Sequence, residues 1–144
     1  MKTFTLIVRY LLGLVFLVFG LNYFFGFIAM PAPAPKAGEF MGALMATGYF
    51  FPLLKVVEIT AAAMLLLNFM APLALVLLAP IVIHILFFHL FLAVAGLPLA
   101  IFLVAAELYL AFAYRESFRG LLSVSHEKKE DDYMRHAGSH VVGI

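Results

Sequence analysis

Residues 3–114 are almost continuously apolar, and this length of apolar chain limits the possible folds more than any other feature. A helix that crosses the hydrocarbon core of a bilayer needs about 20 predominantly apolar residues. Charged residues make up only 12% of the 144-residue chain, against roughly 25% in soluble domains. The sequence therefore predicts an all-α integral membrane protein, a transmembrane four-helix bundle. We expect its spans at about residues 4–29, 50–70, 72–94 and 98–115, within a transmembrane domain of residues 1–122.

Proline and glycine separate these predicted spans. Three prolines within residues 31–35 alternate with alanine after the first span and favour an extended connector. Residues 38–50 then place large apolar side chains at helical spacing, which is typical of a short helix lying on the membrane surface. Pro72 leaves only a very short turn before the third span, so the second and third spans should be neighbours. Gly96 signals the end of the third span.

The basic residues predict the orientation. Lys2 and Arg9 lie at the N-terminal end and five further basic residues follow the last span, whereas the long loop after the first span holds only Lys36. Cytoplasmic flanks of membrane spans carry the excess of Lys and Arg. We therefore expect both termini in the cytoplasm, the short surface helix on the opposite side, and residues 123–144 as a polar cytoplasmic tail.

Composition excludes several classes of function. The net charge is +1 and the basic residues form no stripe, so the electrostatic footprint of nucleic-acid binding is missing. The absence of cysteine excludes disulfides, thiolate nucleophiles, iron–sulfur clusters and covalent haem attachment. Both membrane histidines lie on one predicted span, and no close-spaced ligand motif such as HExxH is present, so we expect neither haem nor a metal site. A redox role would have to borrow its chemistry from a bound cofactor or a partner.

Polar residues that interrupt the spans are the candidate ligand-binding residues. A charge at membrane depth costs ~2.5–3.5 kcal/mol on insertion scales, so such residues usually face the protein interior and mark function. Glu58 is the first candidate, and we expect it to be coupled to His84 across the short turn. The alternative is that a glutamate only fixes helix register and that a histidine only packs. The full candidate set is Asn22, Lys55, Glu58, His84, His89 and Glu107.

Arg9 lies about one and a half turns inside the first span. It has two interpretations, a side chain that snorkels to lipid phosphates or a partner in an interior ion pair. Gly13 and Gly20 fall near the same helical stripe. Small residues at these positions should let a neighbouring helix approach closely.

Three stretches of the chain carry a family likeness. They are RYLLGLVFLVFGLNYFFGF, then FMGALMATGYFFPLLKVVEITAAAMLLL after the proline-rich loop, and finally GLPLAIFLVAAELYLAFAYRESF. Across roughly residues 9–122 the chain resembles the DoxX family of small four-helix bacterial membrane proteins. The resemblance implies a compact bundle in the inner membrane and an association with thiosulfate:quinone oxidoreduction and membrane oxidoreductase complexes. The family's helix-one arginine and helix-two glutamate carry over to Arg9 and Glu58, while the absence of cysteine argues against direct sulfur chemistry.

The functional expectation is a non-autonomous component of a quinone-linked membrane oxidoreductase system. The bundle would hold a small amphipathic ligand, most plausibly a quinone, and no intrinsic cofactor. One alternative is an accessory or scaffolding subunit of a larger membrane complex without a ligand. Another is a small transporter that works as an oligomer. The expected partners are the lipid bilayer and either further copies of the chain or other membrane subunits.

Overall fold

The computed structural model describes residues 2–122, and side chains as far as residue 119. Every regular element in this part of the chain is helical, which confirms the all-α prediction. The chain divides into two compact units, Met1–Tyr114 and Arg115–Ile144, which are described separately. The tail expected at residues 123–144 lies outside the described residues. In order, the elements are α1 (Lys2–Phe25), α2 (Pro35–Ala46), α3 (Phe50–Leu66), α4 (Ala71–Phe91), η1 (Val94–Gly96), α5 (Leu97–Ala113) and α6 (Arg115–Leu122).

Three helical segments of the first unit are long and apolar enough to cross a membrane. They are α1, α4 and the segment Val94–Ala113, which joins η1 to α5. α3 has 17 residues and passes the same test only together with α2, from which it is bent by 93°. By length and composition, the described chain has three candidate spans, or four if the bent pair is one span, and this indicates a multi-pass membrane protein.

The turn between α3 and α4 is set by left-handed backbone. Asn68 and Met70 adopt φ angles of 53° and 50°, a conformation that ends a helix. α3 therefore ends at Leu66, before the residue 70 expected from hydropathy alone. α4 begins at once, at Ala71, with Pro72 in its first turn where the missing N–H breaks no hydrogen bond. α3 and α4 pack together, which confirms the expected neighbour relation of these two helices.

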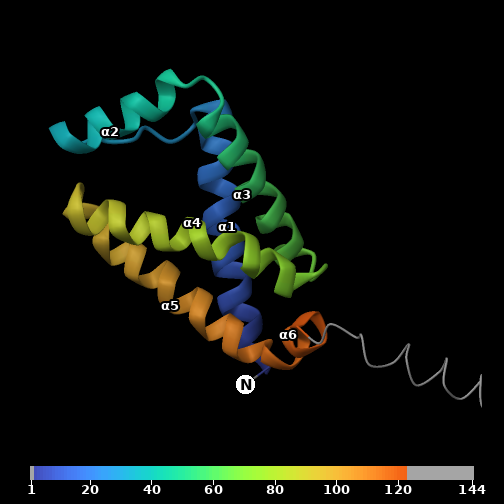
Figure 1. Ribbon diagram of the computed structural model, residues 1–144. Helices are drawn as coiled ribbons and strands as arrows, with labels where there is room; N and C mark the ends of the chain where they lie inside the picture. Colours follow the sequence, from blue (N-terminus) through green and yellow to red (C-terminus); the bar gives the residue numbers. More distant parts are fainter. Residues whose placement is uncertain (1, 123–144) are drawn as a thin grey trace, which may run out of the picture. The chain divides into compact units, whose positions relative to one another are not determined.

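The helices of the first unit pack in a closed order, α1 on α3, α3 on α4, α4 on α5 and α5 on α1 (Figure 1). In α1, α3, α4 and α5 the buried side chains recur mostly three or four residues apart, so one stripe of each of these helices faces the interior. Large apolar side chains on the outward faces are exposed, as a lipid-facing surface requires. The most deeply buried large side chains are Leu12, Leu65, Leu75, Leu78, Leu110 and Val82.

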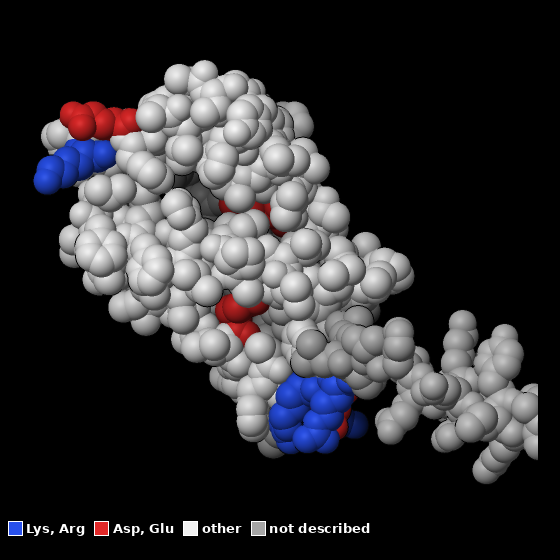
Figure 2. All heavy atoms as spheres, in the orientation of Figure 1, with Lys and Arg blue, Asp and Glu red and all other residues white. Residues whose placement is uncertain are grey.

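Charged side chains occupy little of the face of the first unit shown in Figure 2. The same view shows a hollow in this face beside a group of acidic atoms. Lys36 and Glu39, both on α2, are exposed. The charged residues of the apolar helices are, by contrast, largely buried, and their environments are described below.

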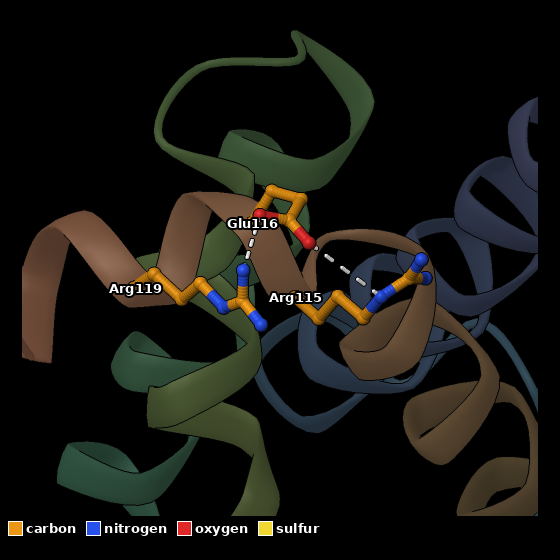
Figure 3. Close-up of polar contacts among 3 residues, drawn as sticks. All are labelled: Arg115, Glu116 and Arg119. Atoms are coloured by element: carbon orange, nitrogen blue, oxygen red, sulfur yellow. Dashed lines mark hydrogen bonds and ion pairs between the residues drawn. The ribbon is translucent and has the colours of Figure 1, made fainter.

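The second unit is described only as far as α6. Glu116 lies between two arginines there (Figure 3), at 3.7 Å from Arg115 Nε and 3.2 Å from Arg119 Nη1. All three side chains are exposed, so water screens these ion pairs.

Candidate functional site

The candidate site is built around an ion pair inside α3. Lys55 Nζ donates a hydrogen bond to Glu58 Oε2 at 2.7 Å, between residues one helical turn apart. The Glu58 side chain is only 3% exposed and that of Lys55 19%. Because each charge is compensated by the other, the pair can persist in an apolar interior, where a lone charge would be costly. Lys55 is the member that reaches toward the surface.

α1 packs closely on α3 along the segment that follows Glu58. A side-chain carbon added at Gly20 would lie 2.7 Å from Ile59 Cγ1, next to Glu58 in sequence. One added at Gly13 would lie 3.4 Å from the Ala62 carbonyl oxygen. The expectation that these glycines allow a close helix approach is confirmed, and α3 is the helix concerned.

His84 does not join the ion pair. Its imidazole is exposed and lies 5.9 Å from the Phe40 ring, centroid to centroid, and the Phe40 ring also lies 6.1 Å from that of Phe88. The predicted hydrogen bond or ion pair between Glu58 and His84 is absent from residues 2–119, so that prediction is wrong. The prediction considers only the depth of the two residues, whereas α4 is rotated so that His84 is exposed. His84 belongs instead to an aromatic cluster of Phe40, His84 and Phe88 between α2 and α4.

The aromatic cluster and the ion pair lie on helices that contact one another. Counted from the turn between α3 and α4, Lys55 is about 16 Å and His84 about 20 Å along its helix, at a rise of ~1.5 Å per residue. α3 and α4 are packed neighbours, and α2 contacts both, α4 through Phe40. α2, α3 and α4 thus carry an ammonium group and aromatic faces on neighbouring helices.

His89 has a local structural role at the end of α4. Its Nδ1 lies 2.9 Å from the Ala93 carbonyl oxygen, so the ring binds the backbone that follows the helix. The ring also packs on Gly96, where any added side-chain carbon would overlap it. The contact holds the connection between α4 and α5 together, which needs both the imidazole and a glycine.

Asn22 holds the loop that follows α1. Its Oδ1 accepts a hydrogen bond from the Ile28 N–H at 2.6 Å, and its Nδ2 donates to the Ile28 carbonyl at 3.1 Å. Gly26, within this loop, has a φ of +60°. The side-chain oxygen and nitrogen of Asn22 both form hydrogen bonds with the backbone, so the residue shapes the loop that leads to α2.

Arg9 is 5% exposed and is held by neutral groups. Its Nη1 donates to Asn68 Oδ1 and, at 3.3 Å, to the Tyr114 hydroxyl. The arginine therefore ties α1 to the turn after α3 and to the end of α5. Within residues 2–119 it forms no ion pair with a carboxylate, and its buried Nε has no hydrogen-bond partner. Sequence reasoning missed both partners, although a left-handed Asn after a helix is a recognisable cap signal.

Glu107, on α5, stands apart from the other candidates. It is 6% exposed, and its buried Oε2 has no hydrogen-bond partner in the described part of the chain. No hydrogen bond or ion pair connects it to Lys55 or Glu58 there. The candidate residues are thus distributed among an ion pair, an aromatic cluster, three backbone or interhelical ties and one isolated carboxyl.

The donor sets do not converge on a metal. Across residues 2–119, no three His, Asp or Glu side chains are placed so that they could hold a metal ion. What the arrangement offers is a set of hydrogen-bond donors on Lys55 of α3 and aromatic faces on the neighbouring helices α2 and α4. That combination suits an organic molecule with a polar head and an apolar body.

Searches for similar proteins return no match of this chain to a protein-family model, to a curated protein or to a solved structure.

Proposed function

We propose that the protein is a DoxX-like four-helix bundle of the inner membrane, with cytoplasmic termini and α2 as an interfacial helix on the opposite side. The three sequence stretches named above support the family assignment. So do the positions of the family's arginine and glutamate, since both Arg9 and Glu58 are buried and bonded. The closed packing order of α1, α3, α4 and α5 is the order expected of such a bundle.

Within this bundle we propose a binding site for a small amphipathic molecule, a quinone, between α2, α3 and α4. The observation that carries the proposal is Lys55, whose charge is balanced by Glu58 at 2.7 Å while its side chain remains 19% exposed. An ammonium has three donors, so two remain for a ligand carbonyl after Glu58 has accepted one. Phe40 and His84 supply flat faces for a quinone ring, since aromatic groups attract one another in tilted or offset stacks.

The chain would act as part of a larger system. It has no cysteine and therefore no thiol redox chemistry of its own. Electrons for a bound quinone would come from a partner subunit. The role assigned to this protein is to bind and orient the quinone in the membrane.

Titration of the purified protein in detergent with a short-chain ubiquinone tests the site. We expect saturable binding by calorimetry, and a Kd raised roughly 2- to 10-fold by Phe40→Ala or His84→Ala, because one aromatic contact is worth about 0.5–1.5 kcal/mol. Phe87→Ala is the matched control, since Phe87 lies on the same helix and its ring contact is with Phe91 instead. The absence of saturable binding, or an equal effect of all three substitutions, would refute the quinone site.

A ligand-free accessory subunit is the second candidate. It is favoured by the observation that Asn22, His89 and Arg9 all bond to their own chain. In that case the polar residues set helix packing only, and the titration would show no binding while a native pull-down would recover a stoichiometric membrane partner.

A further inference from the structure

Glu107 is a buried carboxyl for which residues 2–119 supply no ion-pair partner. It lies on the inward stripe of α5 with Leu103, Ala106 and Leu110, which are also buried. Its Oε2 is inaccessible and lacks a hydrogen bond within residues 2–119. Unlike Glu58, it has no lysine one turn away.

The charged and titratable groups on the elements packed against α5 form no ion pair with Glu107 within residues 2–119. α5 packs on α1, α4 and η1, and η1 has no titratable side chain. On α1, Arg9 Nη1 binds Asn68 and Tyr114, while the buried Nε has no hydrogen-bond partner in the described residues. On α4, His89 binds the Ala93 carbonyl and His84 is exposed beside Phe40. The remaining groups on α1 are exposed: Lys2, Tyr10 and Tyr23.

An ionised carboxylate in this position would be a buried charge without a partner, which costs several kcal/mol in an apolar interior. Binding a proton removes the charge and converts one oxygen into a donor. A metal ion would need several further ligands, and the described residues do not supply them. A proton needs only the one oxygen that is left free.

We propose that Glu107 is a proton-binding site inside the first unit, separate from the Lys55–Glu58 pair. The two membrane carboxylates are then compensated in different ways, Glu58 by an ammonium and Glu107 by a proton. The proposal does not depend on the quinone site, because it uses none of the residues of that site. It gives the bundle a group that can take up and release a proton at membrane depth.

Carbodiimide labelling of the full chain tests this assignment. Dicyclohexylcarbodiimide enters membranes and modifies protonated carboxyls, and the modified residue can be mapped by mass spectrometry. In wild-type protein in detergent we expect an adduct on Glu107 that declines as the pH is raised, with Glu58 unmodified in the same molecules. Lys55→Met should render Glu58 reactive as well, because it removes the only hydrogen-bond partner described for that carboxylate.

Two results would overturn the proposal. One is the absence of a Glu107 adduct at every pH, and the other is a Glu58 adduct as abundant as that of Glu107 in the wild type. Both results are read in the wild-type protein, so the test does not rely on a variant that could fail to fold. As a second readout, the infrared band of a protonated carboxyl should be present in wild type and Glu58→Gln and lost in Glu107→Gln.

Discussion

Two ion pairs of this chain have the same spacing and opposite surroundings, and they separate the effect of burial from that of sequence distance. Lys55–Glu58 and Glu116–Arg119 both join residues three apart. The side chains of the first pair are 19% and 3% exposed, and those of the second 67% and 79%. Low dielectric strengthens the first pair and makes the loss of one partner costly, whereas water weakens the second.

Lys55→Met should therefore destabilise the protein far more than Arg119→Met. The first substitution leaves the buried Glu58 carboxylate without its ammonium, a change that typically costs about 3–5 kcal/mol. Loss of an exposed pair typically costs about 0.2–1 kcal/mol. Unfolding of both variants by denaturant in detergent measures the difference.

The double substitution Lys55→Met, Glu58→Gln is the control for the cause of this loss. It removes both charges, so a large part of the stability should return if an unpaired buried charge is responsible. Equal losses in Lys55→Met and Arg119→Met, or no recovery in the double variant, would contradict the assignment.

At the residue scale, sequence reasoning predicted which polar residues are buried better than it predicted their partners. Glu58, Glu107 and Asn22 are buried because long apolar segments surround them, and this is visible in the sequence. The partner of Glu58 was also visible, since residues three apart on a helix are neighbours. Depth favoured His84 instead, but the side of α4 on which His84 lies depends on the rotation of that helix, which no sequence pattern in this uniformly apolar segment indicates.

The contact between α1 and α3 rests on glycine. A methyl group at Gly20 would approach Ile59 Cγ1 to 2.7 Å, shorter than any ordinary contact. Isoleucine is branched at Cβ and has few alternative rotamers in a helix, so the backbones of α1 and α3 would have to separate.

Gly20→Ala should lower stability by about 1–3 kcal/mol, the usual cost of overpacking. Gly42→Ala is the matched control, because Gly42 is also inside a helix, α2, but has open space where the methyl group would lie. There the better helix propensity of alanine should give about 0.5–1 kcal/mol of stabilisation. Thermal unfolding of the two variants should shift in opposite directions, and a shared direction would show that the close approach does not limit packing.

At the element scale, hydropathy and proline placement predicted the helices α1 to α5, whereas η1 and α6 were not predicted and the ends of α1, α3 and α4 lie before the predicted ends of the spans. α3 ends at Leu66 because Asn68 and Met70 adopt left-handed φ angles, and a single apolar run such as residues 50–70 does not reveal this. The sequence predicts a surface helix before a span at this place, but it does not predict the angle between α2 and α3. Its 93° bend results from the chain geometry around Gly48, whose φ is +73°.

At the scale of the whole molecule, this bend decides how many times the chain crosses the membrane. If α3 is a span and α2 lies on the surface, α1, α3, α4 and α5 make four crossings and the two ends of the unit face the same side. If α2 and α3 together form a re-entrant loop, only three crossings remain. The ends would then face opposite sides. The 17 residues of α3 reach about 26 Å at ~1.5 Å per residue, close to the ~30 Å of a hydrocarbon core, so its length is compatible with both arrangements.

Single cysteines in this cysteine-free chain measure the number of crossings directly. Thr3→Cys, Glu39→Cys and Ser117→Cys place a thiol at exposed positions near the start of α1, on α2 and on α6. The basic residues that flank the chain ends predict four crossings, so a membrane-impermeant maleimide added to intact spheroplasts should label position 39 and leave positions 3 and 117 unlabelled until the membrane is opened. Labelling of 3 and 117 from opposite sides would instead establish three crossings and make α2–α3 a re-entrant loop. In that case Lys55 and Glu58 would lie on a segment that enters and leaves the membrane from one face, and the proposed quinone site would open toward that face.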